Sequence, residues 1–267
     1  MLSRRCTGEI ILMGIYSTYT NVLPDPNNSI GESGQSLAEA SGGKKGAGYA
    51  SVKLASEHKM MNTRTNSGRL ISREVSGHKW NIDISYNPMT RDEFEPVYSF
   101  LLQKRGSLTP FFVSLPQYKA PRDSAFATFV LNSGSTPRTF TMAAAGTAGD
   151  TTILITNSSY DKDSNGKAKP GDIFTIESSD SNHKKVYQVT RVEDDDTYES
   201  GTTAPSATQL RVHFIPALQR SVATGATSKI HFNDPKFRVV LKNDVQEYNL
   251  NTQNLYSFSL KLEEAQP

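Results

Sequence analysis

Hydrophobic and polar residues alternate strictly between Trp80 and Tyr86. A period of two residues is typical of a strand that buries one face. Further along the chain the apolar positions change to a helical spacing of three and four residues; they are Phe94, Val97, Tyr98, Leu101 and Leu102. Alternation returns at residues 111–115. The pattern therefore predicts a strand, a helix and a second strand within residues 69–115.

The two ends of the predicted helix, residues 91–105, carry separate signals. Thr90 and Glu93 have the spacing of a capping box, in which each side chain binds a free backbone N–H group of the first turn. Lys104 and Arg105 suit the negative end of the helix dipole, and Gly106 can adopt the left-handed conformation that ends a helix. These signals place the helix between Thr90 and Gly106.

Residues 126–232 contain short apolar segments separated by turn-rich sequence. The segments are residues 126–131, 139–142, 151–156, 172–176, 186–192, 210–214 and 229–232. Short strands at intervals of about ten to twenty residues suit a small β-barrel or sandwich. We therefore expect residues 124–233 to form an inserted all-β domain.

The last segment of the chain alternates again, at residues 237–241 and 256–262. Strands with one apolar face need a sheet to join, and the strand at residues 80–86 offers one. We therefore predict a mainly β (α+β) fold. Its base is a split β-barrel or sandwich with one helix, built from residues 1–123 and 234–267, with the small all-β domain inserted between the two halves.

Two segments near the start of the chain are less regular. Residues 24–48 are rich in Gly, Ser, Asn, Ala and Lys, so they cannot bury enough apolar surface to offset the entropy lost on ordering. They are either a flexible loop or an arm that becomes ordered against a neighbouring copy. A short apolar run at residues 10–16 is a candidate strand.

Composition narrows the classes of function. The chain has 29 Lys and Arg against 27 Asp and Glu, a balance that gives no indication of a nucleic-acid partner. Its one cysteine, Cys6, excludes an internal disulfide framework and fits assembly in a reducing cytosol. No apolar run approaches the roughly 18 residues of a membrane span, and no secretion signal is recognised, so we expect no membrane partner.

Basic residues gather on and beside the segment that leads into Trp80. They are Arg64, Arg69, Arg73, His78 and Lys79. The simplest interpretation is a solvated strand face. The alternative is a contact with a phosphate or with an acidic neighbour. No aromatic residues are interleaved in the way that single-stranded nucleic-acid binding requires.

A calcium-loop pattern stands at residues 161–172. Its matching positions are Asp161, Asp163, Asn165, Gly166 and, at position twelve, Asp172. Alternating oxygen ligands of this kind ring a hard cation while the glycine makes the sharp turn. Position twelve is normally Glu, however, and the flanks read as strands. An acidic turn uses the same residues for turn chemistry alone, so both interpretations stay open and we assign no metal ligand.

Other candidate chemistry is weaker still. The five histidines lack metal-ligand spacing, and we expect His213 and His231 to be neutral and hydrogen-bonded. No nucleophile elbow and no phosphate-binding glycine motif occurs. Residues 193–196 (Glu-Asp-Asp-Asp) are interpreted as a solvated loop, with the paired carboxylates of a glycosidase as the alternative. We predict no catalytic residue, no cofactor and no enzymatic activity.

Several segments resemble a group of tailed-bacteriophage tail proteins, the distal tail proteins and related rings. The segments are REVSGHKW (residues 73–80), the helix at 91–105 with GSLTPF (106–111), LPQY (115–118), GDTTI (149–153), KPGDIFTI (169–176), YQV (187–189), FIPAL (214–218) and YSFSL (256–260). The resemblance covers residues 69–122 and 146–262 but not residues 1–64. It implies a structural virion protein, assembled in the host cytoplasm, with no catalytic centre.

The resemblance also implies a mode of assembly. Distal tail proteins form a ring, here expected to be hexameric, that connects the tail tube to the baseplate or hub proteins. Genomic DNA passes through the lumen without sequence-specific binding. Identical copies close a ring through heterologous contacts. The alternatives are a repeating tail tube or hub subunit and, from another class, a carbohydrate-binding adhesion module that uses the inserted domain.

Overall fold

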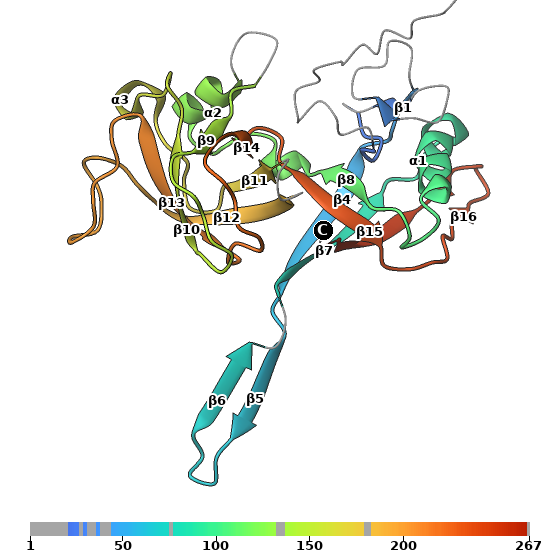
Figure 1. The fold of residues 1–267 in the computed structure, drawn as a ribbon. Helices are drawn as coiled ribbons and strands as arrows, with labels where there is room; N and C mark the ends of the chain where they lie inside the picture. Colours follow the sequence, from blue (N-terminus) through green and yellow to red (C-terminus); the bar gives the residue numbers. More distant parts are fainter. Residues whose placement is uncertain are drawn as a thin grey trace, which may run out of the picture.

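The computed structural model describes residues 21–26, 29–30, 36–37, 44–74, 77–131, 137–178 and 183–265. Cys6, the candidate strand at residues 10–16 and much of the 24–48 segment lie outside this part. The described residues form two lobes and a hairpin that projects from between them (Figure 1). One lobe contains a five-stranded sheet and the other a closed six-stranded barrel, so the mainly β prediction is confirmed.

The five-stranded sheet is the base of the molecule. Its strands, in spatial order, are β4 (Tyr49–Glu57), β7 (Lys79–Tyr86), β18 (Ser259–Glu264), β15 (Lys236–Leu241) and β8 (Phe111–Ser114). All four pairings are antiparallel. Buried and half-buried residues alternate along β7, and Leu262 of β18 stands opposite Ile82 of β7. The C-terminal alternating segment therefore joins the strand of Trp80, as predicted.

Helix α1 (Arg91–Gln103) buries its apolar side chains in the core of this sheet. The Phe100 ring meets Phe111 of β8 edge-on at 5.5 Å. At the first turn the Thr90 N–H donates to Glu93 Oε2 at 3.0 Å, which confirms the predicted capping box. At the other end Arg105 and Gly106 both adopt positive φ, so the chain turns away within a few residues of the predicted end.

Removing the cap should weaken the helix measurably. We expect Thr90→Ala to lower the free energy of unfolding by about 1 kcal/mol, because Glu93 and the first-turn N–H groups lose a partner. The measurement is a urea titration followed by circular dichroism. Thr224→Ala is the matched control, since Thr224 is exposed and a surface change of this kind stays within about 0.5 kcal/mol. Equal stability of the two variants would contradict the capping role.

The second lobe is the barrel. Its strands are β9 (Phe140–Met142), β10 (Thr152–Thr156), β11 (Ile173–Ser178), β12 (His183–Glu193), β13 (Gln209–Ile215) and β14 (Gly225–His231). They close in the order β10-β13-β12-β11-β14-β9 around an aromatic core. Six of the seven predicted segments are confirmed as strands. The base strands lie before and after this stretch in the sequence.

The predicted strand at residues 126–131 is wrong, because these residues belong to helix α2 (Ser124–Leu131). Asp123 Oδ1 accepts a hydrogen bond from the Phe126 N–H at 3.0 Å and so caps the helix. Phe126, Phe129 and Val130 are buried in the barrel core at the spacing of one helical face. An apolar run this short fits both structures, and the aspartate before it decides the outcome.

The shortest elements complete the description. They are β1 (Ser29–Ile30), β2 (Ser36–Leu37), β3 (Lys44–Lys45), the 3-10 turn η2 (Pro116–Tyr118), α3 (Lys162–Asn165), β16 (Asn249–Leu250) and β17 (Tyr256–Ser257). Strand β1 pairs with β2 on one side and with β3 on the other, within the segment predicted as a loop or an arm. None of the helices in the described part of the chain is long and apolar enough to span a membrane.

The two lobes share a buried joint. Ile173 and Val186, from barrel strands, pack into the core of the base. The Trp80 Nε1–H donates to the Val186 carbonyl at 3.1 Å. Beside it, Lys185 Nζ lies 2.5 Å from Glu264 Oε2, and both side chains are almost fully buried. Apolar packing and a buried ion pair therefore hold the barrel against the base.

Candidate functional site

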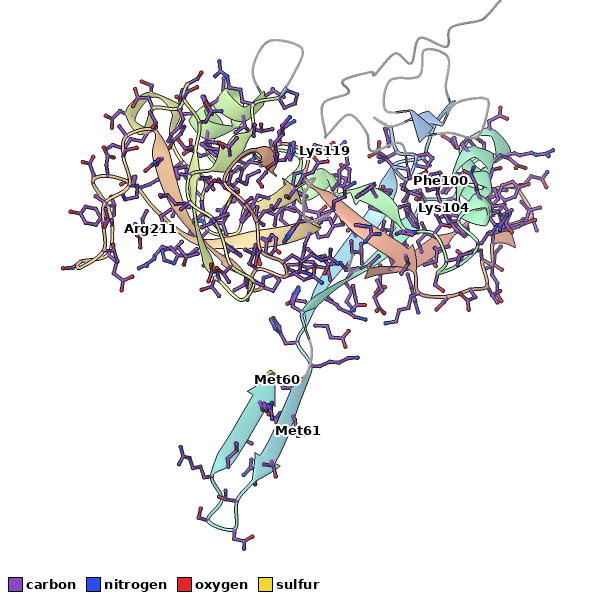
Figure 2. The ribbon with its side chains drawn as sticks, in the orientation of Figure 1. Met60, Met61, Phe100, Lys104, Lys119 and Arg211 are labelled. Atoms are coloured by element: carbon purple, nitrogen blue, oxygen red, sulfur yellow. The ribbon has the colours of Figure 1, made fainter. Side chains whose placement is uncertain are left out.

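The hairpin formed by β5 (Met60–Arg64) and β6 (Leu70–Glu74) is the most exposed part of the fold. These strands pair only with each other, and they extend the β4–β7 pair beyond the body (Figures 1 and 2). About half or more of each large apolar side chain is open to solvent; these side chains are Met60, Met61, Leu70 and Ile71. An isolated two-stranded hairpin is marginally stable in water, so this one is suited to packing against another molecule.

The predicted basic cluster divides between the hairpin and the base. Arg64, Arg69 and Arg73 are exposed on the hairpin and form no ion pair within the described residues. Lys79 instead pairs with Glu263 on the base sheet. His78 is buried edge-on to Trp80, and burial lowers its pKa to about 4. The hairpin therefore carries both apolar and positive surface.

Strand β4 leaves one border of the base sheet open. At the opposite border residues 21–23 are hydrogen-bonded to β8, with the Leu23 N–H donating to the Phe112 carbonyl at 2.8 Å. No described strand pairs with the outer side of β4. A free strand edge presents unpaired N–H and C=O groups that another chain can bind. The open border and the hairpin are continuous, because β4 leads directly into β5.

The sheet face opposite helix α1 is polar. Across three strands its side chains form rows in register: Ser51, Ser85 and Ser259 in one row, and Lys53, Asp83 and Lys261 in the next. The Ser51 and Ser85 hydroxyls lie 2.6 Å apart. Small hydroxyls and charges of both signs leave this face without an apolar surface to bury.

Carboxylates of the acidic turn at residues 161–172 bind N–H and ammonium groups of the protein. Asp161 caps α3 by accepting from the Asp163 N–H at 3.2 Å. The ammonium of Lys162 contacts the carboxylates of Asp163, Asp195 and Asp196. Asp172 turns away to accept backbone N–H groups of Arg122 and Lys169. The geometry favours turn chemistry, and the described residues contain no group of three or more suitable side chains arranged to hold a metal ion.

The solvated-loop interpretation of residues 193–196 is wrong for the first two positions, since Glu193 and Asp194 are buried. Glu193 is held by Arg191, Arg211 and His213. Although burial opposes the shift, hydrogen bonds from Arg211 and His213 lower the pKa of Glu193. A glycosidase acid needs a raised pKa, so this carboxylate is arranged for structure rather than for proton donation.

The histidines of the barrel take hydrogen-bonded structural positions. His213 Nδ1 lies 3.0 Å from Thr152 Oγ1, and His231 Nε2 lies 3.2 Å from Glu177 Oε2. His183 Nε2 lies 2.7 Å from the Tyr187 hydroxyl, and burial lowers the pKa of His183 to about 4. The expected hydrogen-bonded role of His213 and His231 is thus seen.

His183 makes the fold sensitive to acid. At its ordinary pKa of 6.5 the unfolded chain takes up a proton that the folded chain refuses until about pH 4. The contribution of neutral His183 to the free energy of unfolding is therefore fully present above pH 6.5. It falls by about 3 kcal/mol as the pH drops toward 4. Urea titrations across this range should show the loss, and His183→Gln should reduce its slope. The exposed His58→Gln control should reduce the slope much less, since His58 acts only through its ring contact with His78; a reduction of equal size there would contradict this role for His183.

Comparison of the sequence with known proteins shows that the chain is a structural protein of a bacteriophage tail. The chain is similar to the Distal tail protein pb9 of Escherichia phage T5, with 30% identity over 222 residues that cover 82% of this chain and 93% of that protein. The chain belongs to the distal tail protein family, which confirms the resemblance noted in its sequence. No protein-family model matches the chain.

Proposed function

We propose that the chain forms a hexameric ring at the distal end of the phage tail tube and connects the tube to the baseplate or tail tip. The observation that carries this proposal is the exposed hairpin beside the open edge of β4. One chain leaves the apolar side chains of Met61 and Ile71 in water, and a neighbouring copy in a ring would cover them. Family membership supports the place of this ring in the virion.

The ring closes through a heterologous contact. One surface of each copy binds a different surface of the next, and a fixed rotation between neighbours closes the circle. The hairpin with the β4 edge is one of these surfaces. A specific contact of this kind buries about 800 Å² on each partner. The base domain, residues 1–123 and 234–267, supplies the contacts, while the inserted domain at residues 124–233 lies outside them.

The polar face of the base sheet is suited to line the lumen. Its hydroxyls and mixed charges remain hydrated without a partner. Lys53 and Lys261 flank Asp83 in register, so positive charge is offset locally. A lumen wall of this composition gives passing DNA no continuous basic surface to bind, because nonspecific affinity grows with the number of phosphates neutralised. The DNA would pass without sequence-specific contacts.

The purified protein should form closed rings at micromolar concentration. Light scattering should give a mass several times that of one chain, and negative-stain electron microscopy should show rings with a central opening. A protein that stays monomeric under these conditions contradicts the proposal. Cryo-electron microscopy of the intact particle then separates the alternatives, because a connecting ring occurs once at the tube end whereas a tube subunit repeats along the tail.

A further inference from the structure

Two buried histidines lie at the joint between the lobes, one in each lobe. His78 comes directly before β7 of the base and His183 begins β12 of the barrel, and the two residues are 4% and 1% exposed. Each ring contacts a hydroxyl: His78 Nε2 lies 2.8 Å from Ser56 Oγ, and His183 Nε2 lies 2.7 Å from the Tyr187 hydroxyl. Neither hydroxyl carries a negative charge, so neither offsets the charge of an imidazolium.

The ammonium of Lys185 stands next to both histidines. Its Nζ donates to the His78 carbonyl at 3.3 Å, and Lys185 is two residues from His183 on the same face of β12. Burial and, after it, the charge of Lys185 lower the pKa of each ring from 6.5 to about 4. Glu264 already pairs with Lys185. A proton on either ring therefore adds a second positive charge to a buried site.

The other charged groups that act on the two rings do not cancel this effect. His58 meets the His78 ring edge-on at 4.7 Å, and its positive charge opposes protonation of His78. Arg220 has the same effect on His183. Glu264 acts in the opposite direction, because burial raises its pKa and its own proton uptake favours the closed joint. Two histidines oppose one carboxylate, so acid favours the open joint overall.

The joint can open without unfolding either lobe, because each lobe has its own apolar core. Ile173 and Val186 are the barrel residues that belong to the core of the base within the described residues. The chain crosses between the lobes at residues 115–123 and 232–235. Separation therefore exposes few apolar side chains, and an opening of this limited kind requires less free energy than complete unfolding.

We propose that acid releases the barrel from the base, because protonation of His78 and His183 opens the joint while both lobes stay folded. At neutral pH the joint is closed and the lobes lie side by side (Figure 1). In acid each ring takes one proton from the solvent, and the imidazolium becomes hydrated once water enters the joint. The device lies within one chain and does not depend on the proposed ring.

Distances between two spin labels test the proposal. In a Cys6→Ser background, Leu102→Cys on the base and Tyr198→Cys on the barrel place the labels at exposed positions. Dilution with unlabelled chains removes distances between copies. The distribution should be narrow at neutral pH and broaden between pH 6.5 and about 4, with the far-UV circular dichroism unchanged. The opening equilibrium should rise by up to about tenfold per pH unit for each histidine.

Replacing the histidines should remove the response. His78→Gln with His183→Gln keeps polar side chains at both positions but removes the two titrating rings, so the distribution should stay narrow in acid. Each single variant should halve the slope. His213→Gln is the matched control, since His213 contacts Thr152 and Glu193 on the barrel, and it should open as the wild type does.

Quenching of Trp80 fluorescence by acrylamide gives a readout that needs no substitution. Trp80 is 4% exposed and donates to the Val186 carbonyl across the joint, so its quenching constant should rise over the same pH range. A distance distribution and a quenching constant that stay unchanged down to pH 4 overturn the proposal. Loss of the circular dichroism signal together with the broadening also overturns it, as does a double variant that opens with the wild-type slope.

Discussion

Replacing Lys185 with alanine is expected to lower the free energy of unfolding by about 3–5 kcal/mol. The Lys185 ammonium lies 2.5 Å from Glu264 Oε2, and the two side chains are 3% and 4% exposed. Burial lowers the pKa of Lys185 and raises that of Glu264, as expected for charges held away from water. Without its partner the Glu264 carboxylate is a buried charge that keeps, among the described residues, the hydrogen bond from the Trp80 N–H at 3.2 Å.

Urea titration measures this loss directly. Trp80 is the only tryptophan of the chain, and it lies at the joint, so its fluorescence reports on the contact between the lobes. Lys79→Ala is the matched control, because Lys79 on β7 forms a partly exposed pair with Glu263, the neighbour of Glu264 on β18. Removing that pair should cost less than about 1 kcal/mol. A Lys185→Ala variant no less stable than Lys79→Ala would contradict the role assigned to the buried pair.

A double replacement separates the effect of the two charges from the effect of side-chain packing at the joint. Lys185→Met with Glu264→Gln removes both charges and keeps an acceptor for the Trp80 N–H. Such a change is expected to be nearly neutral or even stabilising, since the cost of desolvating two charges disappears with them. A double variant as unstable as Lys185→Ala would instead show that shape at the joint matters more than charge.

The base sheet was predictable because its buried face follows a strict period. Ile82 and Ile84 in one strand and Leu260 and Leu262 in another are fully buried, and they pair across β7 and β18. A period of two residues fixes which side chains share a face, even for strands that are far apart in sequence. Helix α2 was not predicted, because a short apolar run fits a helix and a strand equally well.

The buried joint between the lobes is only weakly indicated by the sequence. Glu264 follows Leu260 and Leu262 in the same alternation, so a charged residue occupies a position of the core series. Lys185 likewise stands in phase with Tyr187 on β12. Nothing in either pattern identifies the partner, since the pair joins strands of different lobes. Tertiary contacts of this kind depend on how the lobes pack, which local periodicity does not contain.

At the hairpin, the sequence pattern suggests buried side chains where the structure has exposed ones. Leu70 and Ile71 begin a segment that reads as an ordinary strand, yet both side chains are about half exposed. A sequence pattern records that a side chain is apolar but not which molecule covers it. For a subunit of an assembly, the apolar residues of the core and those of an interface therefore look alike in the sequence, and only the structure distinguishes them.

Deleting the hairpin should abolish ring formation while leaving the subunit folded. The variant replaces residues 60–74 with a short Asn-Gly turn, a sequence suited to a two-residue connection between antiparallel strands. The deleted strands pair only with each other and their apolar side chains are exposed, so the core loses little. The free energy of unfolding should change by less than about 1 kcal/mol. Light scattering should then give the mass of a single chain.

A gentler variant controls for the change in backbone. Met61→Ser with Ile71→Ser keeps the hairpin and removes two apolar side chains from one of its faces, since Met61 pairs with Arg73 and Ile71 with Thr63. Burying two such side chains at an interface contributes about 1.5–3 kcal/mol each. Rings of this variant should therefore dissociate at concentrations where the wild type stays assembled. If the deletion variant forms rings as well as the wild type does, the hairpin is not the surface that joins neighbouring copies.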